Sequence, residues 1–168
     1  DKDFTVNGVK YHADKNGFVK SMDVWVSPIA GANLNPNSFA LAQRFGYDGG
    51  YRTNSFHDGL DFGSYDHPGS TVQSVHAGTV TQIGYIPGLE WYVTVDTGEY
   101  LVVYQEAFSS RSNINVTVGQ KVEAGTKIGT RNTSHLHLGI TQQKNFNVAL
   151  ASSFSNNGTW LNPLDFIK

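Results

Sequence analysis

Histidine and leucine alternate through residues 135–138, and this alternation constrains the fold more than any other feature of the chain. Successive side chains of an extended strand point to opposite faces, so His135 and His137 share one face while Leu136 and Leu138 share the other. The leucine face is expected to point towards a hydrophobic core. The pattern therefore predicts a strand over residues 135–141 that presents two imidazoles on the face turned away from that core.

Glycine and small polar residues divide most of the remaining chain into short segments with strand character. Apolar runs at 91–95 and 100–104 flank a turn sequence at 96–99, which predicts a hairpin. Residues 72–85 predict one strand with a bend at Gly78. Further short strands are expected at 117–122 and 125–129, and short helices in loops at 38–44 and 147–154. This pattern predicts an all-β fold, an antiparallel β-sandwich or open barrel.

The first 22 residues differ from the rest of the chain. Short alternating runs surround Asn7-Gly8, a turn pair that tolerates positive φ, and they predict a small N-terminal β-hairpin extension. This segment resembles one unit of the aromatic-and-glycine repeats of cell-wall-binding modules, although an ordered linker is the simpler interpretation. We therefore expect an extension over residues 1–22 and one main domain over residues 23–168.

Composition excludes several classes of protein. The 168 residues carry a net charge of −2 without a basic stripe, so neither nucleic acid nor a membrane surface is an expected partner. Cysteine is absent, which excludes a disulfide framework, a cysteine zinc finger and a cysteine nucleophile. No apolar run approaches the length of a membrane span. We expect a monomeric domain of a larger protein.

Two short segments carry residues suited to metal chemistry. His57 and Asp61 stand four positions apart, and His135 and His137 stand two apart. Two imidazoles and one carboxylate form a zinc ligand set that leaves the fourth position open for water. A further histidine beside that water has the chemistry of a general base or acid. Asp58 is expected to face away from the ligands, because it alternates with His57 on an extended strand.

The order and spacing of several motifs across residues 25–166 resemble those of the lysostaphin-type (LytM-like) zinc metallo-endopeptidases of peptidoglycan. The first metal motif of that family resembles residues 56–63, and the second, H-L-H, resembles residues 134–139. Between them lie stretches similar to the family's A-x-G-x-V strand and to its V-x-x-G-x-x-V-x-x-G-x-x-I-G segment, at residues 75–80 and 118–129. The C-terminal stretch that closes family members resembles residues 159–164.

The resemblance implies a role for each matching residue. His57, Asp61 and His137 match the ligands of one Zn²⁺ per domain, and His135 matches the histidine that acts as general base on the zinc-bound water. Tyr51 matches a tyrosine that stabilises the oxyanion, with Tyr47 as a nearby alternative.

Glu106 departs from the family pattern, which usually has a second catalytic histidine at this place in a Y-A-H-L strand. Glu106 is therefore a candidate catalytic residue that takes over proton transfer or orients His135. Alternatively, the site has lost activity and the domain binds without cutting. The sequence around Glu106 also resembles the corresponding strand in tail-associated lysins of phages that infect Gram-positive bacteria.

The resemblance thus implies a hydrolase that cleaves stem or cross-bridge peptides of bacterial peptidoglycan by attack of a zinc-bound water. The alternative is a catalytically silent wall-binding or scaffold module with the same fold. Expected partners are peptidoglycan peptides. The expected location is extracellular or at the cell wall, or on the virion if the chain comes from a phage tail.

Overall fold

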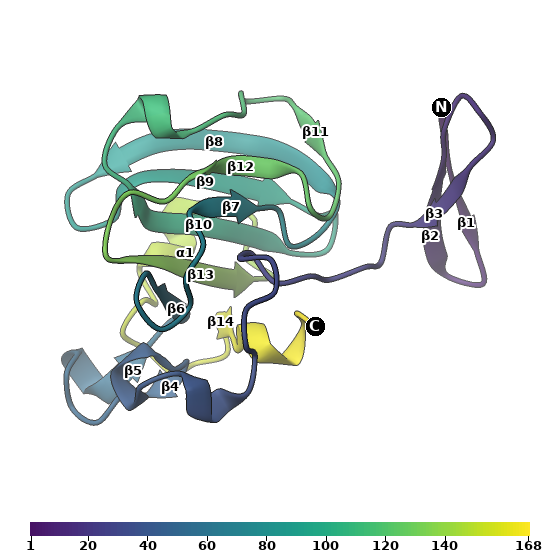
Figure 1. The fold of residues 1–168 in the computed structure, drawn as a ribbon. Helices are drawn as coiled ribbons and strands as arrows, with labels where there is room; N and C mark the ends of the chain where they lie inside the picture. The colour runs from purple at the N-terminus through teal and green to yellow at the C-terminus, as the bar shows by residue number, and fades with distance from the viewer.

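The computed structural model describes all 168 residues and consists mainly of antiparallel β-strands (Figure 1). Its largest sheet is curled and has seven strands, six of which follow the spatial order β11-β8-β9-β10-β13-β14, while β6 also pairs with β13. The strands of this sheet are β6 (Leu60–Gly63), β8 (Gly78–Ile86), β9 (Glu90–Asp96), β10 (Leu101–Phe108), β11 (Lys121–Val122), β13 (His135–Thr141) and β14 (Trp160–Leu161).

Two smaller pairs complete the main domain. Strand β7 (Thr71–Gln73) pairs with β12 (Lys127–Thr130), and β4 (Gly46–Tyr47) pairs with β5 (Phe56–His57). The only α-helix is α1 (Phe146–Leu150), and five single 3₁₀ turns lie in loops. The 3₁₀ turns span Pro36–Ser38, Leu41–Gln43, Thr53–Ser55, Arg111–Asn113 and Pro163–Asp165. No helix has both the length and the apolar character needed to cross a membrane.

Strand β10 is buried on both faces, which makes it the centre of the domain. Val102 and Tyr104 join the main hydrophobic core, whereas Leu101 and Val103 pack in a second cluster with α1 and β14. The Tyr104 hydroxyl accepts a hydrogen bond from the Val75 backbone N–H at 2.8 Å. Complete burial raises the pKa of Tyr104 to about 12, so this hydroxyl stays neutral and joins β10 to the segment after β7.

The all-β prediction is confirmed, including the hairpin of β9 and β10. The prediction of one bent strand over residues 72–85 is wrong, because two strands, β7 and β8, lie in different sheets with residues 74–77 between them. Gly78 begins β8 where a Cβ atom would lie 2.4 Å from the Asp96 carbonyl oxygen, so a side chain has no room there. Residues 38–44 contain the end of one 3₁₀ turn and the 3₁₀ turn Leu41–Gln43 instead of an α-helix, and α1 covers only part of 147–154.

The N-terminal segment forms its own three-stranded sheet, separate from the main domain in Figure 1. The predicted hairpin around Asn7-Gly8 joins β1 (Lys2–Val6) to β2 (Val9–Ala13), and both turn residues have positive φ. A third strand, β3 (Val19–Ser21), pairs with β2 and was not expected. The domain boundary after residue 22 stays a prediction.

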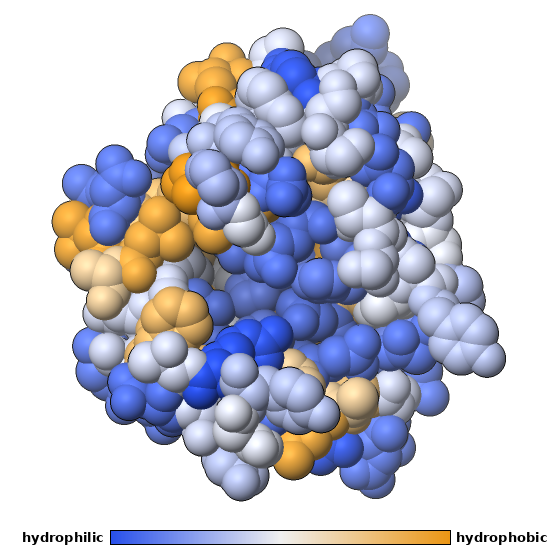
Figure 2. Space-filling model, turned by 90° about the vertical axis from the view of Figure 1, so that its left-hand side faces the viewer, coloured by the Kyte–Doolittle hydropathy of each residue, from blue (hydrophilic) through white to orange (hydrophobic).

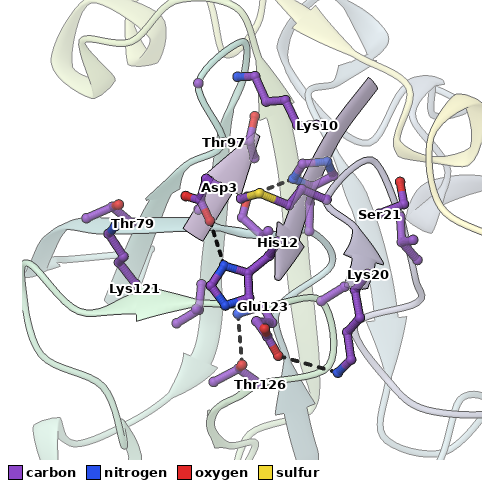
Figure 3. A pocket seen from close by; sticks show the side chains of 18 of the residues that line it. Asp3, Lys10, His12, Lys20, Ser21, Thr79, Thr97, Lys121, Glu123 and Thr126 are labelled. Carbon is purple, nitrogen blue, oxygen red and sulfur yellow. Dashed lines mark hydrogen bonds and ion pairs between the residues drawn. The ribbon is translucent and has the colours of Figure 1, made fainter. Parts of the chain in front are cut away.

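The small sheet and the main domain together line a cavity of about 1200 Å³, and an ion pair connects them there. Figure 3 shows Lys20 reaching Glu123, with 3.8 Å between Nζ and Oε2. Within the small sheet, His12 Nδ1 lies 2.6 Å from Asp3 Oδ1 (Figure 3). None of the candidate zinc or catalytic residues lines this cavity, so the small sheet and the predicted site occupy different parts of the molecule.

Replacing Tyr104 by Phe should lower the free energy of unfolding by about 1–3 kcal/mol, because the buried Val75 N–H would lose its hydrogen-bond acceptor. Denaturant unfolding of the purified chain measures this change. Tyr85→Phe is the matched control, since Tyr85 is exposed. Equal stabilities of the two variants would contradict this role of Tyr104.

Candidate metal centre

The register of three neighbouring strands brings the predicted ligands together. Strand β13 lies between β6 and β10, and His137 is paired with Asp61 on one side and with Gln105 on the other. Directly opposed residues of antiparallel strands present their side chains on the same face. His57 reaches the same place from β5, three residues before β6 begins.

Three donor atoms converge at this point. His57 Nε2 lies 3.1 Å from His137 Nδ1, and Asp61 Oδ1 lies 3.0 Å from His137 Nδ1 and 3.3 Å from His57 Nε2. Ligands at about 2.0–2.1 Å from a tetrahedral zinc are separated from one another by about 3.3–3.4 Å. The spacing and the chemistry of this donor set therefore fit a zinc ion.

Hydrogen bonds outside the cluster orient the two imidazoles. His57 Nδ1–H donates to the Arg44 carbonyl oxygen at 2.9 Å, which leaves Nε2 free to face the cluster. On the far side of the His137 ring, Nε2 lies 3.2 Å from Asp58 Oδ1. Carboxylates in this position fix the orientation of a metal-binding histidine and increase its basicity.

Asp58 does not face away, so the expectation from strand alternation is wrong. The chain turns at Asp58-Gly59 between β5 and β6, and this turn interrupts the alternation. His57, Asp58 and His137 also form a group whose potential ligand atoms lie within 4.8 Å of one another. His137 directs Nδ1 towards Asp61 and Nε2 towards Asp58. Asp61 is therefore the carboxylate that lies close to both His137 Nδ1 and His57 Nε2, the two nitrogens that face the cluster.

The carboxylates and imidazoles of the cluster stabilise one another's charged forms. Burial opposes ionisation of Asp61, but hydrogen bonds and charges from His137 and His57 hold the pKa of Asp61 far below its usual value. Burial likewise opposes protonation of His137, while Asp58 and Asp61 raise the pKa of His137 well above the ordinary histidine value. Asp61 is therefore an ionised oxygen donor, and the carboxylates of Asp58 and Asp61 stabilise positive charge in the cluster.

His135 and Glu106 form a pair at the open side of the cluster. His135 Nε2 lies 3.0 Å from Glu106 Oε1, and Glu106 Oε2 lies 3.7 Å from His137 Nδ1. The side chains of His135 and Glu106 are 29% and 25% exposed, whereas that of His57 is only 1% exposed. The Glu106 hydrogen bond raises the pKa of His135. Burial opposes ionisation of Glu106, but the hydrogen bond with His135, the charge of His137 and the hydrogen bond from Gln105 together lower the pKa of Glu106.

A backbone irregularity turns Glu106 towards the cluster. The register of β10 against β9 shifts between Tyr104 and Phe108, and Glu106 has a φ of +68°. In a regular strand, Gln105 and Glu106 would point to opposite faces. Because of the bulge they lie side by side, and Gln105 Nε2 donates to Glu106 Oε2 at 2.9 Å.

Figure 2 shows the side of the molecule that lies on the left in Figure 1. This face has a hydrophilic hollow at its centre, and apolar side chains border part of the hollow. Tyr51 is 79% exposed and makes no hydrogen bond to the cluster, so its oxyanion role stays a prediction. Tyr47 is also exposed.

Sequence reasoning missed Arg52, whose Nη2 lies 3.3 Å from Asp61 Oδ2. The only sequence signal was a cation directly after Tyr51.

Comparison with known proteins identifies relatives of this fold. The family described as "Peptidase family M23" matches residues 55–151. A crystal structure of cbpa from L. salivarius REN is 56% identical, with a TM-score of 0.83, and the match covers 86% of this chain and 95% of that chain. No curated protein matches the chain.

Two structures with much lower sequence identity resemble this chain only in fold. Helicobacter pylori Csd3 is 19% identical with a TM-score of 0.53, and the match covers 99% of this chain but 42% of that chain. A point mutant of the catalytic domain of the prophage-encoded M23 protein EnpA from Enterococcus faecalis is 20% identical with a TM-score of 0.50, and the match covers 71% of this chain and 85% of that chain.

The resemblance found in the sequence is confirmed at the level of the family, because the matched segment spans more than half of the chain and contains His57, Asp61 and His137. The chain belongs to peptidase family M23.

Proposed function

We propose that this chain is a zinc-dependent endopeptidase that hydrolyses stem or cross-bridge peptide bonds of bacterial peptidoglycan. The observation that carries the proposal is the convergence of His57 Nε2, Asp61 Oδ1 and His137 Nδ1 beside the partly exposed pair of His135 and Glu106. Membership of peptidase family M23 supports peptidase chemistry. The substrate places the proposed activity outside the cell or at the cell wall, or on a virion.

His57, Asp61 and His137 would hold the zinc ion in this proposal. When bound, zinc would act as a Lewis acid that activates water and polarises the scissile carbonyl group. The buried ligands are held by Arg44 and Asp58, so the site is organised before substrate arrives. Their burial also keeps bulk water away from the ligand atoms.

His135 and Glu106 would perform the proton transfer. In this proposal His135 is the general base, and its Nε2 forms a hydrogen bond with Glu106 Oε1 at 3.0 Å. Glu106 Oε2 faces the ligand cluster, so the carboxylate joins the cluster to the imidazole. The pair would take a proton from water and return it to the nitrogen of the leaving amine.

The backbone of Glu106 supports a functional role for this residue. A non-glycine residue at positive φ costs on the order of 1–3 kcal/mol, and such strain gathers at functional sites. Here the strained conformation is what directs the carboxylate to His135.

A silent wall-binding or scaffold module is the second candidate function. The observation that favours it is the ion pair of Glu106 with His135, which occupies the imidazole needed for catalysis. Turnover separates the two candidates, whereas zinc content does not, because a silent module can retain its metal.

Replacing His57, Asp61 or His137 by Ala should remove both bound zinc and activity, because each supplies one donor atom. His135→Ala should keep zinc and lower activity by about 10²–10⁴-fold, because only proton transfer is lost. Zinc content is measured by elemental analysis, and activity by release of new amino termini from purified Gram-positive peptidoglycan without new reducing ends. His12→Ala is the control, since His12 lies in the small sheet. Full activity of His135→Ala would refute the assignment of the general base.

Glu106→Gln tests the second half of the pair. The amide keeps the size of the side chain but removes the proton acceptor, so kcat should fall by about 10²–10⁴-fold while zinc content stays constant. Unchanged turnover would make Glu106 a bystander. If the wild-type chain releases no amino termini from walls of several cross-bridge types, with or without o-phenanthroline, the silent module becomes the better description.

A further inference from the structure

The two oxygens of the Asp61 carboxylate have different partners. Oδ1 faces the donor cluster, 3.0 Å from His137 Nδ1 and 3.3 Å from His57 Nε2. Oδ2 instead accepts a hydrogen bond from Arg52 Nη2 at 3.3 Å. The Asp61 side chain is 7% exposed and that of Arg52 is 30% exposed, so the contact lies at the inner edge of the site and not on the open surface.

Arg52 is itself held in place from the opposite side. Its Nη1 donates to the Ala42 carbonyl oxygen at 2.7 Å and to Asp48 Oδ2 at 3.3 Å. Asp48 is completely buried, and its carboxylate also accepts the backbone N–H groups of Gly50 and Arg52. The short loop from Asp48 to Arg52 is therefore closed around the Asp48 carboxylate and directs the guanidinium towards Asp61.

The backbone of this loop permits the arrangement. Gly49 and Gly50 have φ values of +81° and +92°, a region that residues with a Cβ atom rarely adopt. The two consecutive glycines let the chain turn so that the Asp48 side chain bonds back to Gly50 and Arg52. The sequence Asp-Gly-Gly-Tyr-Arg thus encodes a rigid support for one arginine.

A guanidinium beside a site that takes a dication is unfavourable unless carboxylates offset its charge. Here Asp48 and Asp61 contact the two terminal nitrogens of Arg52, so one cation bridges two anions. The planar guanidinium can contact both carboxylates at once through separate N–H groups, which a lysine ammonium cannot reproduce with the same geometry.

We infer that Arg52 is a positioning residue that holds Asp61 Oδ2 away from the donor cluster, so that Asp61 would bind zinc through Oδ1 alone and would leave the fourth coordination position open. The inference rests on the proposed zinc site, and it concerns the denticity of one ligand. A free carboxylate can offer both oxygens to a metal, and the second oxygen would then occupy the position that a catalytic zinc site leaves open.

The test compares the wild-type chain with Arg52→Met and Arg52→Lys in metal binding. Loss of the contact should weaken zinc affinity by about 10–100-fold, measured by competition with a chromogenic chelator. In the cobalt-substituted protein, the visible absorption should fall in intensity, because a second Asp61 oxygen raises the coordination number above four. Arg52→Lys should behave like Arg52→Met, since charge alone does not hold both carboxylates.

Arg111→Met is the matched control, because Arg111 is also held by its guanidinium, which donates to the backbone carbonyl oxygens of Ile114 and Val116 at 3.1 and 3.2 Å, but it has no contact with the cluster. It should leave zinc affinity and the cobalt spectrum unchanged. Circular dichroism and thermal unfolding of the metal-free variants establish that each one folds. Should Arg52→Met fail to fold, Asp48→Asn tests the same support and should shift affinity and spectrum in the same direction.

The outcomes separate this inference from the proposed function. A wild-type chain that binds no zinc would overturn both. A wild-type chain that binds zinc, together with Arg52 variants of unchanged affinity and spectrum, would overturn only the role of Arg52. Recovery of the wild-type spectrum in Arg52→Lys would also overturn it, because charge and not the two-sided contact would then be sufficient.

Discussion

The pairing of β13 with β6 and β10 sets the positions of His137 and Asp61, around which the candidate metal centre is assembled. His137 lies opposite Asp61 in one pairing and opposite Gln105 in the other. A slip of one residue in either pairing would turn His137 or Asp61 to the core face and Leu136 or Leu138 to the site. The same leucines are completely buried, so the hydrophobic core that stabilises the sheet also fixes the register on which the ligand geometry depends.

Around this register, departures from regular backbone place the remaining groups. The bulge at Glu106 brings a carboxylate to the ligand face of β10, and the turn at Asp58 brings another to the far side of His137. Strained or irregular backbone persists where neighbouring structure determines it fully. Strand β10 meets this condition because both of its faces are buried. Strand β10, buried on both faces, thus holds Glu106 in its irregular backbone conformation.

Much of the architecture was predictable because it follows from local pattern. Alternation in residues 135–138 predicted β13, turn chemistry predicted the β9–β10 hairpin, and the motifs around His57 and His137 predicted the family. Errors arose where one apolar run was divided between sheets, as at Gly78, or where a turn broke the alternation, as at Asp58. Neither event leaves a periodic signal, because each depends on a neighbour distant in the sequence.

By itself, the sequence determined that two imidazoles share one face of a buried strand, that a histidine and a carboxylate stand four residues apart, and that the chain resembles a zinc peptidase family. Only the tertiary structure decided which atoms converge and what holds them. His57 and His137 are separated by 80 residues, and Glu106 and His135 by 29. The division of the Asp61 oxygens between His137 and Arg52 arises from strand register and one glycine loop. Such contacts depend on packing in three dimensions, which no local pattern specifies.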